Sequence, residues 1–382
     1  MSRESGIPQG DFVGNRESDL LAATLVHLRA LVGFDTRNPP RAIDTGGIFD
    51  YLSAQLPGFT LRVTDHGTGS VALHAVRGTP RLLFNVHVDT VPDSPAWTAD
   101  PHTLRLAGDR AIGLGACDIK GAAAALLAVA DATDGDMALL FSSDEEGSDP
   151  RCIANFLRGE HAYRAVIVAE PTQARAVLAH RGILSVRMDF AGRAGHASAE
   201  QGAADSALHQ AVRWGDAALD FVAAHAQDRF GELQGWRFNI GVVQGGIKAN
   251  MIAPSVELRF GCRPLPNLDT DWLLERLRTL REPLPSAFAT TFRGPALPAG
   301  AAAQAEQRRE LARQLAVGLA LPPGPAVDFW TEAALFSAAG LTALVYGPGD
   351  IAQAHSADEW VALEELRQYA TSIHRIVEHG QA

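Results

Sequence analysis

Apolar residues along the first 180 positions follow two alternating patterns. Leu21, Leu25, Leu28 and Val32 recur at helical spacing and predict a helix over residues 17–32. Short continuous apolar runs predict buried strands, and alanine-rich or periodic runs between them predict further helices. The predicted strands are 61–63, 70–76, 82–88, 137–141 and 165–169, and the further helices are 47–56, the run after Gly121, and 152–157. This alternation is typical of an α/β sheet covered by helices on both faces.

The pattern changes after about Leu178. Residues 183–190 alternate between apolar and polar, and segments 238–243 and 256–262 have the pattern of half-exposed strands. Helices fit residues 203–224 and 270–281, which gives the β-α-β-β-α order of a small two-layer α+β unit. Residues 293–304 are rich in Pro, Gly and Ala and predict a linker. After it come a helix before Leu321, a strand at 341–346 and a helix at 357–379.

These patterns predict two domains, one interrupted by the other. We expect an α/β domain built from residues 1–180 and 294–382, with an inserted α+β domain at residues 181–293. The 382 residues are 47% hydrophobic and 20% charged, which supplies a sizeable core and excludes a disordered chain.

The charge balance limits the partners that the protein can have. The sequence holds 33 Lys and Arg against 44 Asp and Glu, a formal net charge of −11. Nucleic-acid binders draw affinity from basic residues that neutralise phosphates, so no nucleic-acid partner is expected. An anionic substrate would need cations or metal ions gathered locally.

The cysteines and the terminal segment indicate where the protein works. Cys117, Cys152 and Cys262 are far apart and form no CxxC pair, so they predict reduced thiols rather than a disulfide framework. The first 20 residues lack the apolar stretch of a signal peptide. The longest apolar run, 122–130, is far shorter than the ~20 residues that span a bilayer. We expect a cytoplasmic protein with no membrane partner.

Carboxylates and histidines stand where the predicted strands end, which is where α/β sheets place functional residues. Alone, each has a commoner explanation, such as a core histidine, a helix N-cap or a solvated turn. Together they supply the nitrogen and oxygen ligands that suit Zn²⁺, Co²⁺ or Mn²⁺. The candidate ligands are His87, Asp118, Glu146, Glu170 and His355. A carboxylate shared by two such ions would form a two-metal hydrolytic site.

Two further acids accompany these candidate ligands. Asp89 follows His87 by two residues, so in a strand both face the same side and Asp89 can orient the imidazole. Glu145 precedes Glu146 and remains free of a ligand role. An acid beside metal-bound water that is not itself a ligand suits a general base.

In order and spacing, the motifs HVD, GACDIKG, DEEG, AEP and the late histidine after GPG resemble the M20 metallopeptidase/deacylase family. The resemblance covers nearly the whole chain from about Leu20. It implies a zinc-exopeptidase-like catalytic domain with a mixed sheet between helices, and an inserted ferredoxin-like lid that also forms a homodimer.

The resemblance also implies roles for the residues of the motifs. His87, Asp118 and Glu170 would bind one zinc or cobalt ion, and Asp118, Glu146 and His355 the other, with Asp118 bridging. Asp89 would orient His87, and Glu145 would be the general base. A cis peptide bond is expected between Asp118 and Ile119.

Further expectations concern the substrate. His196, in a GHxS motif, would stabilise the oxyanion, commonly in the partner subunit's site. Asn250 and Arg263 match lid positions that contact substrate, and an arginine can clasp a carboxylate through two hydrogen bonds. The sequence departs from relatives at FWTE, residues 329–332, where many have TDA. The candidate substrate-binding residues are Asn250, Arg263, Lys248, Glu332, Gly347 and Gly349.

The resemblance implies metal-assisted hydrolysis of a small N-acylated amino acid. The pattern is most similar to the deacetylases of N-acetylornithine and N-acetylcitrulline in arginine biosynthesis. Acetylornithine deacetylases often place an acid directly after the glycine pair that matches Gly245-Gly246, whereas Ile247 and Lys248 follow the pair here. Because Lys248 and the missing acid both disfavour the ornithine ammonium, we hypothesise N-acetylcitrulline as the substrate, with N-acetylornithine as the other expected substrate.

Other functions remain open at this stage. A succinyl-diaminopimelate desuccinylase, or a dipeptidase or carboxypeptidase of the same family, would use the same metal site. A metal-free binding or scaffold protein on the same fold is a different class, although the intact ligand set argues against it. The sequence has neither the GxSxG of serine hydrolases nor the HExxH of zincins.

Overall fold

The computed structural model describes residues 10–147, 149–198, 200 and 205–379. Contacts between residues divide the chain into two compact units. The first contains the chain up to Val177 together with Ala312–Gly324 and the residues from Thr331 onward. The second contains Leu178–Leu311 and Pro325–Trp330. It stays a prediction that residues 1–180 and 294–382 form the catalytic domain. It also stays a prediction that residues 181–293 form the lid and dimerisation domain.

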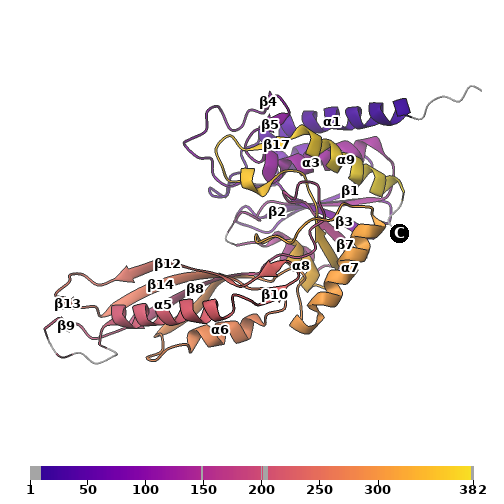
Figure 1. Cartoon of the computed structure of the whole chain (residues 1–382). Helices are drawn as coiled ribbons and strands as arrows, with labels where there is room; N and C mark the ends of the chain where they lie inside the picture. The colour runs from indigo at the N-terminus through magenta and orange to yellow at the C-terminus, as the bar shows by residue number, and fades with distance from the viewer. Residues whose placement is uncertain (1–9, 148, 199, 201–204, 380–382) are drawn as a thin grey trace, which may run out of the picture. The chain divides into compact units, whose positions relative to one another are not determined.

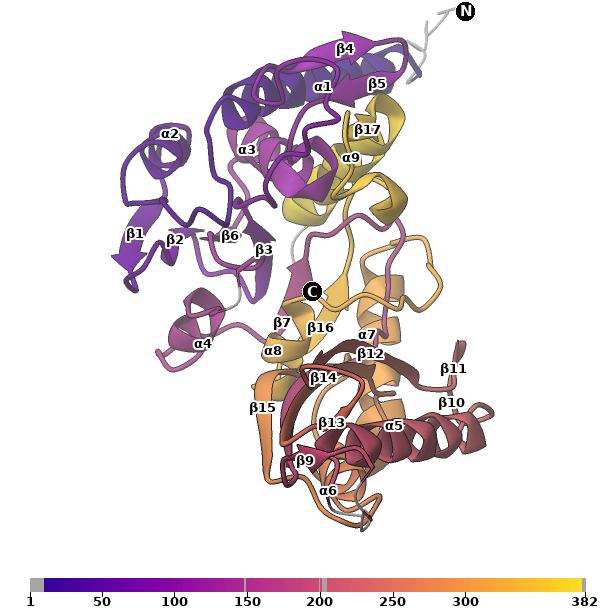
Figure 2. The same cartoon turned by 90° about the vertical axis from the view of Figure 1, so that its left-hand side faces the viewer.

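A six-stranded mixed sheet forms the centre of the first unit, in the order β1-β2-β6-β3-β7-β16. The strands β6, β3, β7 and β16 are parallel to one another. β2 runs antiparallel to them, and β1, which pairs antiparallel with β2, runs in the same direction as the four parallel strands. Every residue of β3, β6 and β7 is buried, as expected for parallel strands covered on both faces. The bounds are β1 (Thr60–Asp65), β2 (Val71–Arg77), β3 (Leu82–His87), β6 (Met137–Ser142), β7 (Ala165–Val168) and β16 (Thr342–Val345). Figure 2 shows β7 and β16 side by side.

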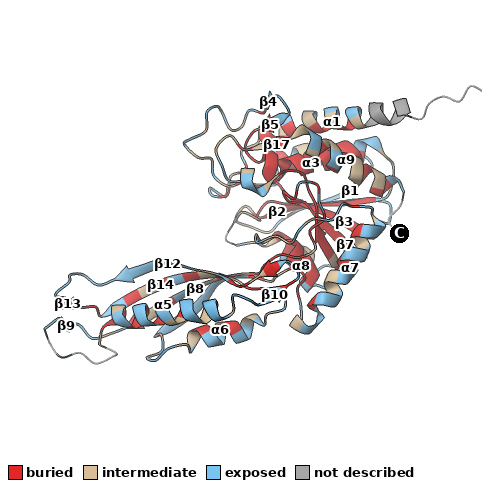
Figure 3. Cartoon of the chain, viewed as in Figure 1, coloured by how far each residue is buried: buried red, intermediate tan, exposed pale blue. Residues whose placement is uncertain are grey.

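Helices cover this sheet on both faces, so the predicted mixed α/β fold is confirmed. The helices α1, α3 and α9 lie on one face and α8 on the other (Figure 1). Most of α3 is alanine, and ten of its residues are buried, because small side chains let a helix pack closely (Figure 3). The helices are α1 (Gly10–Val32), α2 (Ile48–Ala54), α3 (Gly121–Ala132), α4 (Cys152–Phe156), α7 (Ala305–Gly318), α8 (Ala333–Ala338) and α9 (Leu363–Glu378).

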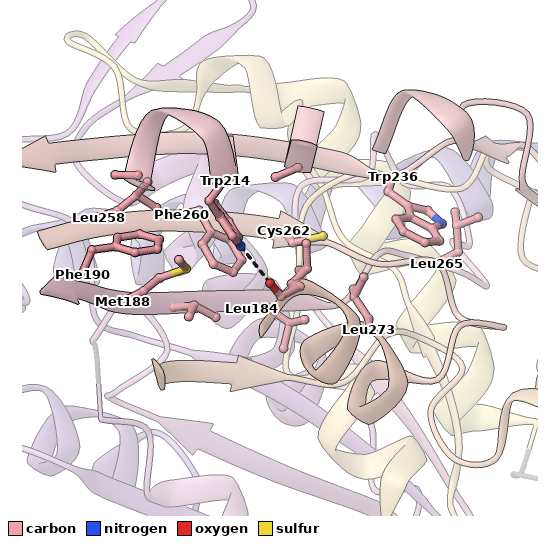
Figure 4. Close-up of a cluster of buried hydrophobic side chains, with 14 of the residues drawn as sticks. Leu184, Met188, Phe190, Trp214, Trp236, Leu258, Phe260, Cys262, Leu265 and Leu273 are labelled. Carbon is pink, nitrogen blue, oxygen red and sulfur yellow. Dashed lines mark hydrogen bonds between the residues drawn. The ribbon is translucent and has the colours of Figure 1, made fainter. Parts of the chain in front are cut away.

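The second unit contains a four-stranded antiparallel sheet in the order β12-β14-β8-β15. Alternate residues of β8 and β14 form its core around Trp214 of α5, as Figure 4 shows. The indole Nε1 of Trp214 donates a hydrogen bond of 2.9 Å to the backbone oxygen of Leu277 in α6. The main elements are β8 (Ile183–Ala191), α5 (Ala207–Ala224), β12 (Arg237–Gly245), β14 (Ser255–Arg263), α6 (Thr270–Arg278) and β15 (Ala287–Gly294). Short pairs are β9 (Gly195–His196) with β13 (Met251–Ile252), and β10 (Arg229–Phe230) with β11 (Leu233–Gln234).

The structure differs from the predicted elements in a few places. The helix predicted over 357–379 begins only at Leu363, because Trp360–Ala362 forms β17, which pairs with β5 (Arg110–Ile112). β5 also pairs with β4 (Arg105–Ala107) in a small sheet that the sequence did not predict. The strand β15 was also not predicted. The predicted start of α5 at residue 203 lies outside the described residues.

Candidate metal centre

The candidate ligands gather at the carboxyl ends of the parallel strands. His87 is the last residue of β3 and lies opposite Ser142, the last residue of β6. Glu145 and Glu146 follow β6 in the next turn, and Glu170 follows β7 by two residues. Because β3 pairs with both neighbours in parallel, these three chain segments leave the sheet at the same edge.

Asp118 reaches this edge from a tight turn ahead of α3. Gly115 has φ 76°, the left-handed conformation that glycine adopts freely, and begins the single turn η1 (Ala116–Lys120). The peptide bond between Asp118 and Ile119 is cis, as predicted. A Cβ at Gly121 would lie 2.5 Å from the Ala116 oxygen, so a glycine is needed where the turn meets α3.

Two groups of side chains are arranged to hold metal ions. One is His87, Asp118 and Glu170, the other is Asp118, Glu146 and His355, and in each the ligand atoms lie within 4.8 Å of one another. Asp118 belongs to both groups. Its Oδ1 lies 3.1 Å from His87 Nε2, and its Oδ2 lies 3.5 Å from His355 Nε2. The two oxygens of one carboxylate therefore face the two histidines.

The residues present fit a pair of divalent cations. Glu170 Oε1 is buried 3.9 Å from His87 Nε2, and no group in the described part of the chain donates a hydrogen bond to it. A buried carboxylate oxygen without a partner is costly, and a cation would satisfy it. The mixture of imidazole nitrogens and carboxylate oxygens is the donor set of zinc and cobalt sites.

The electrostatics of the ligands show how strongly this site attracts positive charge. Burial acts to lower the pKa of His87, but its hydrogen bonds to Asp118 and Asp89 outweigh burial and raise it. Hydrogen bonds to Asp118 and Glu146 raise the pKa of His355 to about 10. Burial raises the pKa of Glu170, and the negative charge of Asp118 adds to the effect. The carboxylates around both imidazoles therefore stabilise positive charge at this site, which is where a metal ion would add it.

Asp89 is completely buried and connects His87 to the loop after β6. The His87 Nδ1 atom lies 3.4 Å from Asp89 Oδ1 and 3.1 Å from the Asp89 backbone oxygen. The carboxylate also accepts hydrogen bonds from the backbone N–H groups of Glu145 and Glu146, at 3.3 and 3.0 Å. The Asn38 side-chain amide donates a third, at 3.1 Å. One buried acid therefore fixes a histidine and both glutamates that follow β6.

Glu145 belongs to neither ligand group. Its half-buried carboxylate makes no hydrogen bond to any other described residue. Burial raises the pKa of Glu145 well above its usual range, and the nearby Glu146 carboxylate raises it further. A carboxylate with a raised pKa and no hydrogen-bond partner beside candidate metal ligands can exchange a proton with water.

Three other candidates of the first unit surround the ligands. Glu332 is 1% exposed, and its Oε2 accepts a 3.0 Å hydrogen bond from the Ser142 hydroxyl, so its predicted contact with substrate gains no support here. A Cβ on Gly347 would lie 2.5 Å from the backbone oxygen of Glu170, and one on Gly349 would lie 2.6 Å from Cys117 Sγ. Both glycines therefore let the loop after β16 pack directly against the ligand loops.

The remaining candidates lie in the second unit. His196 is exposed in β9, and its Nδ1 lies 2.6 Å from the Ser198 hydroxyl. Asn250 and Lys248 are exposed in the turn between β12 and β13, and Arg263 is half-buried at the end of β14. Burial lowers the pKa of Arg263. The roles predicted for these four residues stay predictions.

The sequence did not reveal Glu359, a buried acid that touches the loop of Asp118. Its carboxylate accepts backbone hydrogen bonds from Gly115, Cys117 and Asp118, at 3.1, 2.8 and 2.9 Å. Burial raises its pKa to about 7. Its partners lie more than 240 residues away along the chain, so no local pattern could have found it.

Comparison with known proteins identifies the family of this chain. The model of peptidase family M20/M25/M40 matches residues 83–379. The chain therefore belongs to the M20 peptidase family. This membership confirms the resemblance deduced from the motifs and the prediction that the protein is a hydrolase.

The curated relatives extend over almost the whole chain. An N-acetyl-L-citrulline deacetylase from Xanthomonas campestris pv. campestris is 66% identical over 361 residues, covering 94% of this chain and 99% of that protein. An acetylornithine deacetylase from Myxococcus xanthus is 30% identical and covers 95% of this chain and 98% of its own length.

Solved structures share the fold at low sequence identity. An M20 family metallo-carboxypeptidase from Sulfolobus solfataricus superimposes with a TM-score of 0.70 at 13% identity, covering 92% of this chain and 98% of that one. The aminopeptidase PepT from Bacillus cereus has a TM-score of 0.69 at 16% identity, with coverages of 94% and 98%. Within the described part of the chain, every helix is too short or too polar to cross a membrane.

Proposed function

We propose that this protein hydrolyses the acetyl amide of N-acetyl-L-citrulline, releasing acetate and citrulline, as a step of arginine biosynthesis. The observation that carries the proposal is the 66% identity to an N-acetyl-L-citrulline deacetylase along 99% of that relative. The two candidate ligand groups at the carboxyl ends of β3, β6 and β7 support it, because amide hydrolysis needs an activated water.

The proposed cofactors are two divalent ions, zinc or cobalt. His87 and Glu170 would hold one, Glu146 and His355 the other, and Asp118 would bridge them. When bound, the two ions would activate the attacking water and polarise the acyl carbonyl. Two observations support this assignment. Glu170 Oε1 is buried and accepts no hydrogen bond from the described residues, and the two carboxylate oxygens of Asp118 lie near His87 and His355 respectively.

Glu145 is the proposed general base. Its carboxylate accepts a proton from the attacking water and then donates that proton to the leaving amine nitrogen. Asp89 supports this step, because it fixes the backbone N–H groups of Glu145 and Glu146 and contacts His87. His196 is the proposed donor to the oxyanion, a role typically worth roughly 10²–10³ in rate.

Three of the six proposed substrate-binding residues, Arg263, Asn250 and Lys248, belong to the second unit. Arg263 would clasp the α-carboxylate, with Asn250 and the loop of Gly347 and Gly349 beside the ligand. Lys248 is exposed and positive, so it disfavours the ornithine ammonium but tolerates the neutral ureido group of citrulline. Glu332 remains a weaker candidate because it is buried.

The proposal includes a homodimer formed through the second unit. β12 is one of the two edge strands of its sheet, and Val243 on this strand is 49% exposed. Val212 and Leu219 of α5 are exposed as well, at 64% and 56%. An exposed edge strand with apolar side chains nearby is suited to pairing with a second chain. The buried free thiols support the cytoplasm as the proposed location.

Deacetylation of N-acetylornithine is the second candidate, because the Myxococcus xanthus relative carries that activity in its name. Steady-state assays of the purified protein with Zn²⁺ or Co²⁺ test the proposal. The panel contains N-acetylcitrulline, N-acetylornithine, N-succinyl-diaminopimelate and simple dipeptides. Metal-dependent release of acetate from N-acetylcitrulline, abolished by EDTA, is expected. Cleavage of the succinyl compound or dipeptides alone would contradict the proposal, and so would full activity without metal.

A further inference from the structure

We infer that Glu359 is a positioning residue of the metal centre, which holds the backbone of the bridging Asp118 in its ligand geometry. Its Oε1 accepts the N–H groups of Cys117 and Asp118, at 2.8 and 2.9 Å, and its Oε2 accepts that of Gly115, at 3.1 Å. This inference rests on the proposed metal site.

Glu359 is itself firmly held in the structure. Its backbone oxygen accepts a 3.0 Å hydrogen bond from Gly113, and the next residue, Trp360, pairs with Ile112 between β17 and β5. The backbone and side chain of one residue thus make four hydrogen bonds to the segment 113–118. This segment cannot shift toward the ligands or away from them without breaking several of these bonds.

Burial makes these hydrogen bonds matter. Glu359 is 1% exposed, and a buried carboxylate that loses its donors incurs the full cost of its desolvation. The three N–H groups lie at the start of a helical turn, where backbone donors have no partners within the helix. The carboxylate of Glu359 and the three N–H groups therefore supply each other's hydrogen-bond partners. Movement of the loop would leave the carboxylate without donors and the N–H groups without an acceptor.

Glu359 also joins two of the three chain segments that supply one ligand group. His355 precedes it by four residues, and Asp118 and His355 both belong to the second group of candidate ligands. Asp89 plays the equivalent part for the segment of Glu145 and Glu146, whose backbone N–H groups it accepts. Two buried acids outside the ligand groups thus fix the loops that carry the ligands.

The test compares wild type with Glu359→Gln and Glu359→Asp. Glutamine keeps one accepting oxygen, but its amide NH₂ group faces a backbone N–H group that also needs an acceptor. Aspartate keeps the negative charge, but its side chain is shorter by one methylene, so the carboxylate lies farther from the backbone N–H groups. Both variants should fold and should bind Co²⁺ roughly 10–100-fold more weakly, the usual cost of removing an outer-shell partner. The visible spectrum of bound Co²⁺ should change, and amide exchange of residues 115–118 should quicken in the metal-free protein.

Asp136→Asn is the matched control, because the carboxylate of Asp136 also accepts a backbone hydrogen bond, from Thr79. Asp136 precedes the first residue of β6, whereas the candidate ligands follow the last residue of this strand. It should leave the Co²⁺ affinity and spectrum unchanged. Unchanged amide exchange at residues 115–118 in both Glu359 variants would overturn the inference. Wild-type affinity in Glu359→Asp but not in Glu359→Gln would also overturn it, because charge alone would then suffice. Failure of wild type to bind metal would instead refute the proposed function, and the exchange measurement would still decide the inference.

Discussion

Acids of similar sequence context take different roles because their oxygens face different partners. Asp118 has one oxygen toward each histidine, Asp89 accepts backbone N–H groups, and the carboxylate of Glu145 makes no hydrogen bond to another described residue. The sequence could predict the positions of these acids, because Asp89 and Glu145 follow apolar runs that end at the sheet edge and Asp118 directly precedes the apolar run of α3. It could not predict Glu359, whose partners are distant along the chain.

The role of Glu145 predicts the behaviour of Glu145→Gln. Because Glu145 lies outside both ligand groups, the variant should keep its full metal content. Loss of the general base should lower kcat by roughly 10²–10⁴-fold. Metal analysis and steady-state kinetics check this, with the exposed Glu160→Gln as the control. Activity within a few-fold of wild type would show that another group moves the proton.

Glu332 predicts a pH dependence of stability. Burial raises its pKa from 4.5 to about 8, and the charge of Asp144 contributes. Between these values the folded protein holds a proton that the unfolded chain releases, so stability falls as the pH rises through this window. Glu332→Gln lacks this proton but can still accept from Ser142. Urea unfolding of the metal-free proteins should therefore show the variant gaining stability relative to wild type between pH 5 and pH 8.5. If the difference in the free energy of unfolding between Glu332→Gln and wild type were the same at pH 5 and pH 8.5, this account would be contradicted.

At the scale of elements, the core of each unit could be predicted and its edges could not. Long apolar runs such as β3 and β6 are set by burial, so their position follows from the sequence. The strands β4, β5 and β17 have three residues each, too few to show a period. β17 exists because its backbone pairs with β5, and this pairing delays the start of α9 to Leu363.

Close packing of the loop after β16 predicts the effect of Gly347→Ala. The new Cβ would lie 2.5 and 2.8 Å from backbone atoms of Glu170, so the ligand loop must move. We expect a loss of about 1–3 kcal/mol in the free energy of unfolding, together with weaker metal binding. Gly318→Ala is the control, because nothing lies within 4 Å of its Cβ. Chemical denaturation and metal titration measure both effects, and equal results for the two variants would contradict the packing argument.

At the scale of the whole molecule, all the candidate metal ligands lie in the first unit, and four of the proposed substrate-binding and catalytic residues lie in the second. The sequence could predict an inserted unit because the apolar pattern changes after about Leu178. The second unit also contains residues 294–311 and 325–330, because these residues make their contacts within it. The sequence could not predict these contacts, because the Pro-, Gly- and Ala-rich composition of residues 293–304 is that of a linker.

The proposed dimer predicts the outcome of Val243→Lys. A charge on the exposed edge strand β12 should oppose pairing with a second chain and convert the dimer to a monomer. Val317→Lys, a similarly exposed position in the first unit, should remain a dimer. Sedimentation velocity distinguishes the two states. A wild-type monomer, or an unchanged dimer in Val243→Lys, would contradict the proposed interface.

The central claim is that the protein deacetylates N-acetylcitrulline, and a comparison of kcat/KM for N-acetylcitrulline and N-acetylornithine tests it most directly. With Zn²⁺ or Co²⁺ present, the neutral ureido substrate should be preferred by at least about tenfold, equivalent to about 1.4 kcal/mol of transition-state binding. A clear preference for N-acetylornithine, or no hydrolysis of either compound, would contradict the account.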